Sequence, residues 1–199
     1  MRKRVRITLR LIGALAALLL ILAGALWLRL RPDSKGRVVP LFESIDMSAL
    51  RQFTDAIRST TSIQVFEGLP HQSWENELLE SEIASKETFK SHGHHFYSIA
   101  ISPAGDDGDA LRSHALNPSG FEEWSGMKTC GGYHPDWMIR WTSPDGATHE
   151  LHLCFGCHEA KFYGPGYQLY CNVPKKSYDG FKAILERYAS QRPSKPKAK

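Results

Sequence analysis

Apolar and polar side chains alternate through the second half of the chain. Large apolar residues recur at every second position from Trp137 to Trp141, which predicts a half-buried strand over 137–142. Ser143-Pro144-Asp145-Gly146 follows, with proline and glycine at the positions that a tight turn prefers. The returning strand carries two sets of side chains on opposite faces: Leu151, Leu153 and Phe155, and Glu150, His152 and Cys154. Two further strands, 159–163 and 167–173, flank a turn at 164–166.

Apolar residues at helical spacing predict four helices. The first helix runs to about residue 59 and is capped by Asp46 or Ser48. The second runs from a cap at Ser73 to about 84, and a short third begins at 106 or 107 and ends before Asn117. The last is capped by Ser177, with four inward positions: Phe181, Ile184, Leu185 and Tyr188. Strands are predicted at 62–67, 88–90 and 95–101. The pattern therefore predicts an α+β domain, an antiparallel β-meander with packed helices.

The amino-terminal region has a different composition. Residues 1–10 are basic, and Leu11 to Leu28 form an uncharged apolar run of eighteen residues. A helix of that length spans about 27 Å, close to the hydrocarbon thickness of a bilayer. The chain is thus divided into a basic cytoplasmic flank (1–10), a transmembrane anchor (11–30), a spacer (31–44), a domain (45–190) and a disordered basic tail (191–199). A cleaved signal peptide is the alternative for the apolar run.

The charge distribution bears on location and on partners. Residues 1–37 carry nine Lys or Arg and one acid, whereas residues 38–190 carry twelve Lys or Arg and twenty acids. Since basic residues stay on the cytoplasmic side, we expect a single-pass protein of the bacterial inner or cell membrane, with an extracytoplasmic carboxyl-terminal domain. The acidic domain makes nucleic acid an unlikely partner, which leaves the membrane as the predicted one.

One motif carries a specific chemical hypothesis. Cys154-Phe155-Gly156-Cys157-His158 matches the C-x-x-C-H pattern that attaches c-type haem. Cys154 and Cys157 would bond to the haem, and His158 would be an axial iron ligand. The motif is predicted in a turn between strands, however, and Gly156 suits such a turn without any cofactor. Haem c electron transfer is therefore the alternative function rather than the favoured one.

The cysteines admit two other interpretations. Cys130, His134, Cys154 and Cys157 together make a Cys₃His set of the kind that holds structural zinc. With Cys171 the chain has four cysteines, an even number that favours disulfides outside the cytoplasm. Bridges between Cys130 and Cys154 or between Cys157 and Cys171 would tie neighbouring loops together. Structural cysteines are the favoured interpretation.

No established catalytic motif is present. The chain contains no G-x-S-x-G, P-loop, H-E-x-x-H or dinucleotide fingerprint. His92, His94 and His95 surround Gly93 at a predicted hairpin tip, which is more typical of a solvated turn than of a metal site. The sequence therefore gives no support for a hydrolase, kinase or dehydrogenase.

Several short motifs resemble a group of uncharacterised exported or membrane-anchored bacterial proteins. They lie at residues 65–71, 121–126, 128–136 and 154–157, and in Arg192-Pro193. The resemblance spans most of residues 62–193, but the group has no known activity and transfers no catalytic residue. It implies a C-F-x-C turn with no required histidine after it, which argues against a haem role for His158. Together these features predict a membrane-anchored α+β module with a structural or metal-binding Cys/His cluster.

Overall fold

The computed structural model describes residues 47–125 and 131–193. These belong to one compact unit, Ile45–Lys199. The predicted membrane anchor, its basic flank and most of the spacer lie outside the described residues. Within the described ranges, no helix is both long enough and apolar enough to cross a bilayer.

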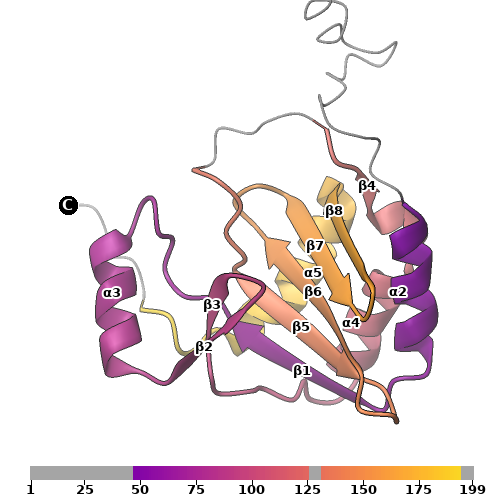
Figure 1. Cartoon of the computed structure of the whole chain (residues 1–199), viewed down its shortest axis with the longest axis horizontal. Helices are drawn as coiled ribbons and strands as arrows, with labels where there is room; N and C mark the ends of the chain where they lie inside the picture. The colour runs from indigo at the N-terminus through magenta and orange to yellow at the C-terminus, as the bar shows by residue number, and fades with distance from the viewer. Residues whose placement is uncertain (1–46, 126–130, 194–199) are drawn as a thin grey trace, which may run out of the picture. The chain divides into compact units, whose positions relative to one another are not determined.

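A six-stranded antiparallel sheet forms the centre of the domain (Figure 1). Its strands, in spatial order, are β1 (Ser62–Glu67), β5 (Trp137–Thr142), β6 (Thr148–Cys154), β7 (Glu159–Gly164), β8 (Tyr167–Asn172) and β4 (Glu122–Glu123). The run from β5 to β8 confirms the predicted meander. β1 joins it from far along the chain, pairing Val65 with Ile139.

Helices cover one face of this sheet, which confirms the α+β class (Figure 1). The helices are α2 (Ser48–Arg58), α3 (Asn76–Ser85), α4 (Asp107–Leu116) and α5 (Lys175–Leu185), with short 3₁₀ turns at Pro118–Gly120 and Glu186–Tyr188. α2, α4 and α5 pack on the sheet, and α3 lies apart from it.

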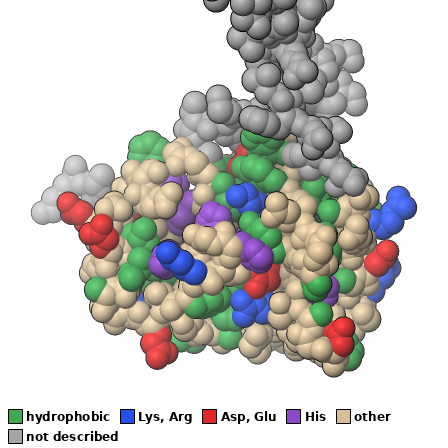
Figure 2. Space-filling model, viewed as in Figure 1, with side chains coloured by type: hydrophobic (Ala, Val, Ile, Leu, Met, Phe, Trp, Pro, Cys, Tyr) green, Lys and Arg blue, Asp and Glu red, His purple; other side chains and the backbone are tan. Residues whose placement is uncertain are grey.

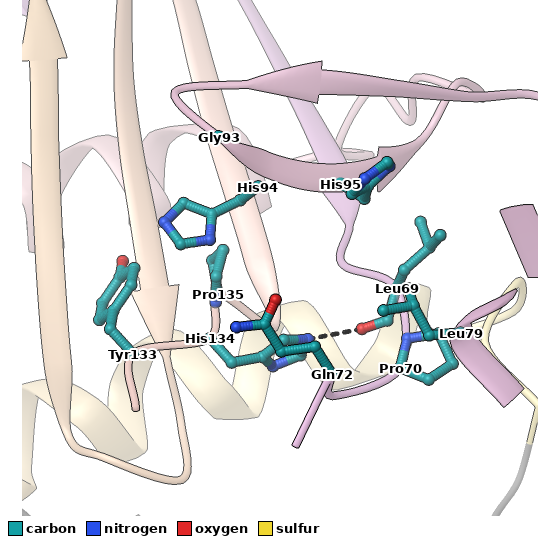
Figure 3. A pocket seen from close by; sticks show the side chains of 10 residues that line it. All are labelled: Leu69, Pro70, Gln72, Leu79, Gly93, His94, His95, Tyr133, His134 and Pro135. Atoms are coloured by element: carbon teal, nitrogen blue, oxygen red, sulfur yellow. Dashed lines mark hydrogen bonds between the residues drawn. The ribbon is translucent and has the colours of Figure 1, made fainter. Parts of the chain in front are cut away.

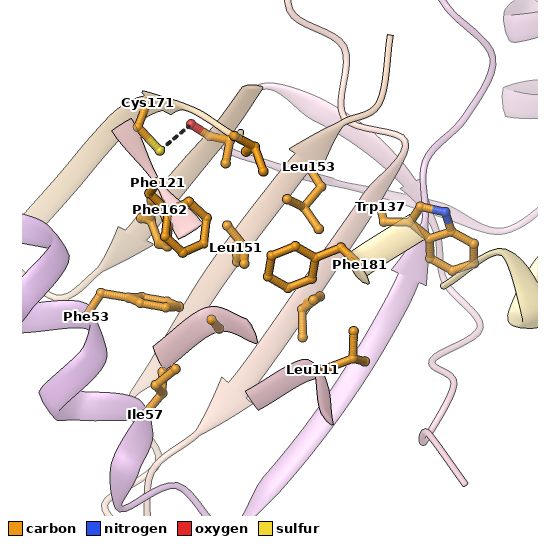
Figure 4. Close-up of a cluster of buried hydrophobic side chains, with 14 of the residues drawn as sticks. Phe53, Ile57, Leu111, Phe121, Trp137, Leu151, Leu153, Phe162, Cys171 and Phe181 are labelled. Atoms are coloured by element: carbon orange, nitrogen blue, oxygen red, sulfur yellow. Dashed lines mark hydrogen bonds between the residues drawn. The ribbon is translucent and has the colours of Figure 1, made fainter. Parts of the chain in front are cut away.

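The main core lies between the sheet and these three helices (Figure 4). Phe53 of α2 is fully buried and packs edge-to-face on Trp141 and Phe162, with ring centroids 5.6 and 4.6 Å apart. From α5, Phe181 and Leu185 enter the same cluster, as the spacing of the last helix predicts. The alternating apolar positions of β5 and β6 thus face the helices.

The predicted capping residues of three helices are wrong. The first residue before α2 is Met47, which makes no side-chain cap. α3 begins at Asn76 rather than after Ser73, because the imidazole Nδ1 of His71 accepts the Ser73 backbone N–H and the chain first makes a tight turn. α5 begins directly after Pro174, so Ser177 lies inside its first turn. Proline fixes the backbone for a helix start, which decides this boundary.

A separate hairpin lies on the opposite face of the sheet. It consists of β2 (Thr88–Ser91) and β3 (His94–Tyr97), so its second strand is shorter than the predicted 95–101. Its two turn residues, His92 and Gly93, both have positive φ values, 48° and 84°, as a two-residue hairpin turn requires.

Candidate functional site

Four segments that are distant in sequence meet around one pocket of about 170 Å³. They are the turn before α3, the segment leading into β5, the turn between β6 and β7, and the chain after the last 3₁₀ turn. The lining residues are His71, Trp74, Glu75, His134, Asp136, Cys154, Gly156, Cys157 and Arg192. The pocket therefore gathers most of the motif residues that the sequence singles out.

Arg192 fixes one side of this pocket. Its guanidinium donates to Glu75 at 2.8 Å and to Asp136 at 3.0 Å. The backbone N–H groups of Ser190 and Gln191 donate to the buried carboxylate of Glu67 at 3.1 and 2.8 Å. These bonds hold residues 191–193, the first part of the predicted tail, against the domain. Residues 194–199 lie outside the described part of the chain.

Two imidazoles also line this pocket. The ring centroids of His71 and His134 are 4.7 Å apart. His134 Nε2 lies 2.7 Å from the carbonyl oxygen of Leu69, and its Nδ1 lies 3.9 Å from Asp136. Burial lowers the pKa of His134, and the charge of Asp136 opposes that effect only in part. His134 is therefore neutral at physiological pH, and it donates its Nε2 proton to Leu69.

The turn between β6 and β7 is closed by its own hydrogen bonds. The Cys157 N–H donates to the sulfur of Cys154 at 3.3 Å, and the Phe155 N–H donates to Asp136 at 2.6 Å. Burial raises the pKa of the Cys154 thiol to about 11. Cys154 is thus protonated at neutral pH and is a poor nucleophile.

The predicted bridges of Cys154 and Cys171 are wrong. Both residues are buried and neither forms a disulfide, which rules out the Cys130–Cys154 and Cys157–Cys171 pairings. Cys171 lies in the main core with its sulfur 3.7 Å from the carbonyl oxygen of Ala160 (Figure 4). Cys157 takes part in a disulfide, and its sulfur lies 3.6 Å from the carbonyl oxygen of Gly132. Cys130 lies outside the described residues.

His158 is the last residue of the turn, with a φ of 55°, and β7 begins at the next residue, Glu159. Its ring stacks on Tyr178 of α5, with centroids 4.0 Å apart. The imidazole of the C-x-x-C-H motif therefore packs against a helix.

The predicted zinc ligands are only partly described. His134, Cys154 and Cys157 lie around the same pocket, while Cys130 is outside the described ranges. Among the described residues, no group of three or more His, Cys, Asp or Glu side chains is arranged to hold a metal ion. The zinc set stays a prediction.

His134 also lines a second, smaller hollow of about 40 Å³ (Figure 3). The hairpin contributes Gly93, His94 and His95 to its wall, and Tyr133 and Leu69 face them. His95 Nδ1 is buried and has no hydrogen-bond partner in the described structure. The hairpin thus forms one side of this hollow.

A buried polar network links the hairpin to the sheet beside this hollow. Glu150 accepts hydrogen bonds from Arg140 at 2.8 Å and from the fully buried His152 at 2.9 Å. Ser91 of the hairpin donates to the same carboxylate at 2.5 Å. Burial alone would raise the pKa of Glu150, but these hydrogen bonds and the charge of Arg140 lower it to about 2. Figure 2 shows histidine side chains gathered on this face.

Sequence reasoning missed several of these residues. Glu75 and Arg192 are 117 positions apart, and no short motif joins them. Glu150 and His152 do show a signal, because both lie on the polar face of a strand that the alternation predicts. That pattern places them on one face but does not show that the hairpin buries them.

Comparison with known proteins gives no family for this chain. No protein-family model matches it, and neither the curated proteins nor the solved structures contain a match. The resemblance to uncharacterised membrane-anchored proteins therefore stays a prediction, and the function rests on the site itself.

Proposed function

We propose that this chain is a single-pass membrane protein whose extracytoplasmic domain is a non-catalytic binding module. Its ligand site is the 170 Å³ pocket between His71, His134, Asp136 and Arg192, and its cysteines serve the fold. The observation that supports this site most strongly is that four segments distant in the sequence meet at this one pocket. The pocket volume suits a small polar molecule or a single side chain of a partner.

The chemistry of the lining favours binding over catalysis. Arg192 is neutralised by two carboxylates, and Cys154 is a protonated thiol. A thiol nucleophile is typically activated by a lowered pKa, whereas burial raises the pKa of Cys154. The His71 and His134 rings and the Glu75 carboxylate instead offer fixed hydrogen-bonding positions around the space.

We further propose a single Cys130–Cys157 disulfide. Neither Cys154 nor Cys171 forms a disulfide, so neither is the partner of Cys157. The Cys157 sulfur lies next to Gly132, two positions along the chain from Cys130. Such a bridge would tie the segment before β5 to the turn after β6 and stabilise the domain by about 2–4 kcal/mol.

The same residues do not suit covalent haem. Haem c needs both cysteines of the motif as thioethers and the following histidine as an iron ligand. Here Cys157 is engaged elsewhere, Cys154 is buried, and His158 is stacked on Tyr178. A bound haem would have to break all three arrangements.

Filling the pocket tests its role as a ligand site. Gly156 is exposed and lines the pocket, and a Cβ added there meets no atom within 4 Å. Gly156→Leu should therefore place a side chain in the pocket without unfolding the domain. We expect small-molecule fragments to shift the NMR signal of the Trp74 indole N–H in the unmodified chain, and Gly156→Leu to weaken this binding at least tenfold.

Ser113→Leu, which adds the same side chain at an exposed position of α4, is the control and should bind as the unmodified chain does. Fragments that bind equally well to Gly156→Leu would contradict this choice of site.

A further inference from the structure

The β2–β3 hairpin is attached to the rest of the domain by few backbone hydrogen bonds. It forms its own two-stranded sheet. Its backbone contacts with the β1 region are the isolated bridge of Gly68 with Phe96 and the hydrogen bond from the Leu69 N–H to the His95 carbonyl, 3.3 Å long. A two-stranded hairpin is marginally stable by itself in water. Its folded position therefore depends on side chains that dock it on the large sheet.

One part of this docking is apolar. Phe89 and Phe96 of the hairpin pack with Phe66 and Met138 of the sheet in a small cluster separate from the main core. Phe66 and Phe89 meet edge-to-face at 5.2 Å. The hairpin thus covers an apolar patch that would be exposed without it.

The other part of the docking is polar and rich in imidazoles. Ser91 donates to Glu150, and the His92 ring stacks on Tyr163 at 3.6 Å. The His94 ring lies edge-on to His152, with centroids 6.2 Å apart. The contact between hairpin and sheet therefore includes two facing histidines, His94 and His152.

The groups that face these two histidines are mostly cationic or become so in acid. They are Lys161 on β7, His134 before β5 and His92 at the turn of the hairpin. Arg140 on β5 binds the same carboxylate, Glu150, as His152 does. Glu150 is the carboxylate that bonds to His152 in the described part of the chain, and it is already shared with Arg140 and Ser91. Tyr133 and Tyr163 have raised pKa values and stay neutral. Each proton added to His94 or His152 thus places a new charge next to existing positive ones.

We infer that the β2–β3 hairpin is a lid that acid releases from the sheet. At neutral pH both histidines are uncharged and the lid is closed over Phe66 and Met138. In mild acid the lid lifts while the six-stranded sheet stays folded, which exposes the apolar patch and opens the hollow lined by His94 and Tyr133. This inference rests on the docking contacts of the hairpin and not on the proposed ligand pocket.

The direction of the pH effect follows from the histidines. Burial, followed by the charge of Lys161, lowers the pKa of His94 to about 4, and burial also lowers that of His152. In the open hairpin His94 returns to about 6.5. The open state then binds more protons, so the closed state has its full stability above about pH 6.5 and loses it as pH falls towards 4. Glu150 acts in the same direction but only at lower pH.

Hydrogen exchange across a pH series tests the lid. With the full chain in detergent, and after correction for the intrinsic exchange rate, protection of the hairpin amides 89–97 should fall at least tenfold between pH 7.5 and pH 5. Amides of Leu151 and Phe162 in the large sheet should keep their protection. His94→Gln should make the fall at least threefold smaller, since His152 alone then responds to acid, and His158→Gln, outside the hairpin, should leave it unchanged.

Hairpin protection that does not change with pH would overturn the inference. A loss of protection that also affects the amides of Leu151 and Phe162 would overturn it too, because acid would then be unfolding the whole domain. If His94→Gln does not fold, the pH series of the unmodified chain decides between these outcomes by itself.

Discussion

Replacing Glu150 by alanine should lower the free energy of unfolding by about 3–5 kcal/mol, the range for breaking a buried ion pair by removing one partner. Glu150 is buried, and Arg140 is largely buried beside it. Without the carboxylate, the guanidinium of Arg140 keeps its charge with no counter-charge, and the Nε2–H of His152 loses its acceptor.

Urea unfolding followed by tryptophan fluorescence measures this loss. Glu87→Ala removes the same side chain at an exposed position and should change stability by less than about 0.5 kcal/mol. Glu150→Gln keeps the size of the side chain but removes its charge. This variant should therefore still be less stable than the unmodified chain. A Glu150→Ala variant as stable as the Glu87→Ala control would show that the network contributes little.

Replacing Phe53 by alanine should cost about 3–5 kcal/mol. Phe53 is fully buried and joins α2 to the sheet through two edge-to-face ring contacts, with Trp141 and Phe162. Alanine leaves a cavity there, because β5 and β7 are held in the sheet and do not collapse into the space (Figure 4).

Calorimetry or denaturant unfolding measures the effect, and Phe53→Leu is the matched variant. Leucine refills part of the space, so its loss should be clearly smaller than that of Phe53→Ala. Equal losses for the two variants would mean that the aromatic contacts, and not the cavity, dominate at this position.

Local patterns predicted most of the sheet. The alternation over 137–142 and the turn at 143–146 are local signals, and the β5–β6 pair follows from them. The pairing of β1 with β5 is not a local property, since Val65 and Ile139 meet across a long stretch of chain. β4 has only two residues, too few for any periodicity to indicate it.

The site was predictable only where its residues are unusual in type. Cysteines and histidines drew attention to His134, Cys154 and Cys157, and these do line one pocket. Glu75 and Arg192 look like ordinary surface residues in the sequence, and their importance comes from their ion pair across the fold. For His158 the sequence suggests too much. The short C-x-x-C-H motif indicates an iron ligand, but in the fold the His158 ring packs against Tyr178.

We propose that the cysteines are structural and that the pocket holds neither haem nor zinc. One purified sample of the full chain tests it, through a visible spectrum, metal analysis and thiol titration. We expect a colourless protein without stoichiometric metal, with two thiols, Cys154 and Cys171, that react only after unfolding. A Soret band with a covalent haemochrome, or one zinc ion per chain whose removal makes the three thiols of Cys130, Cys154 and Cys157 reactive, would contradict these expectations.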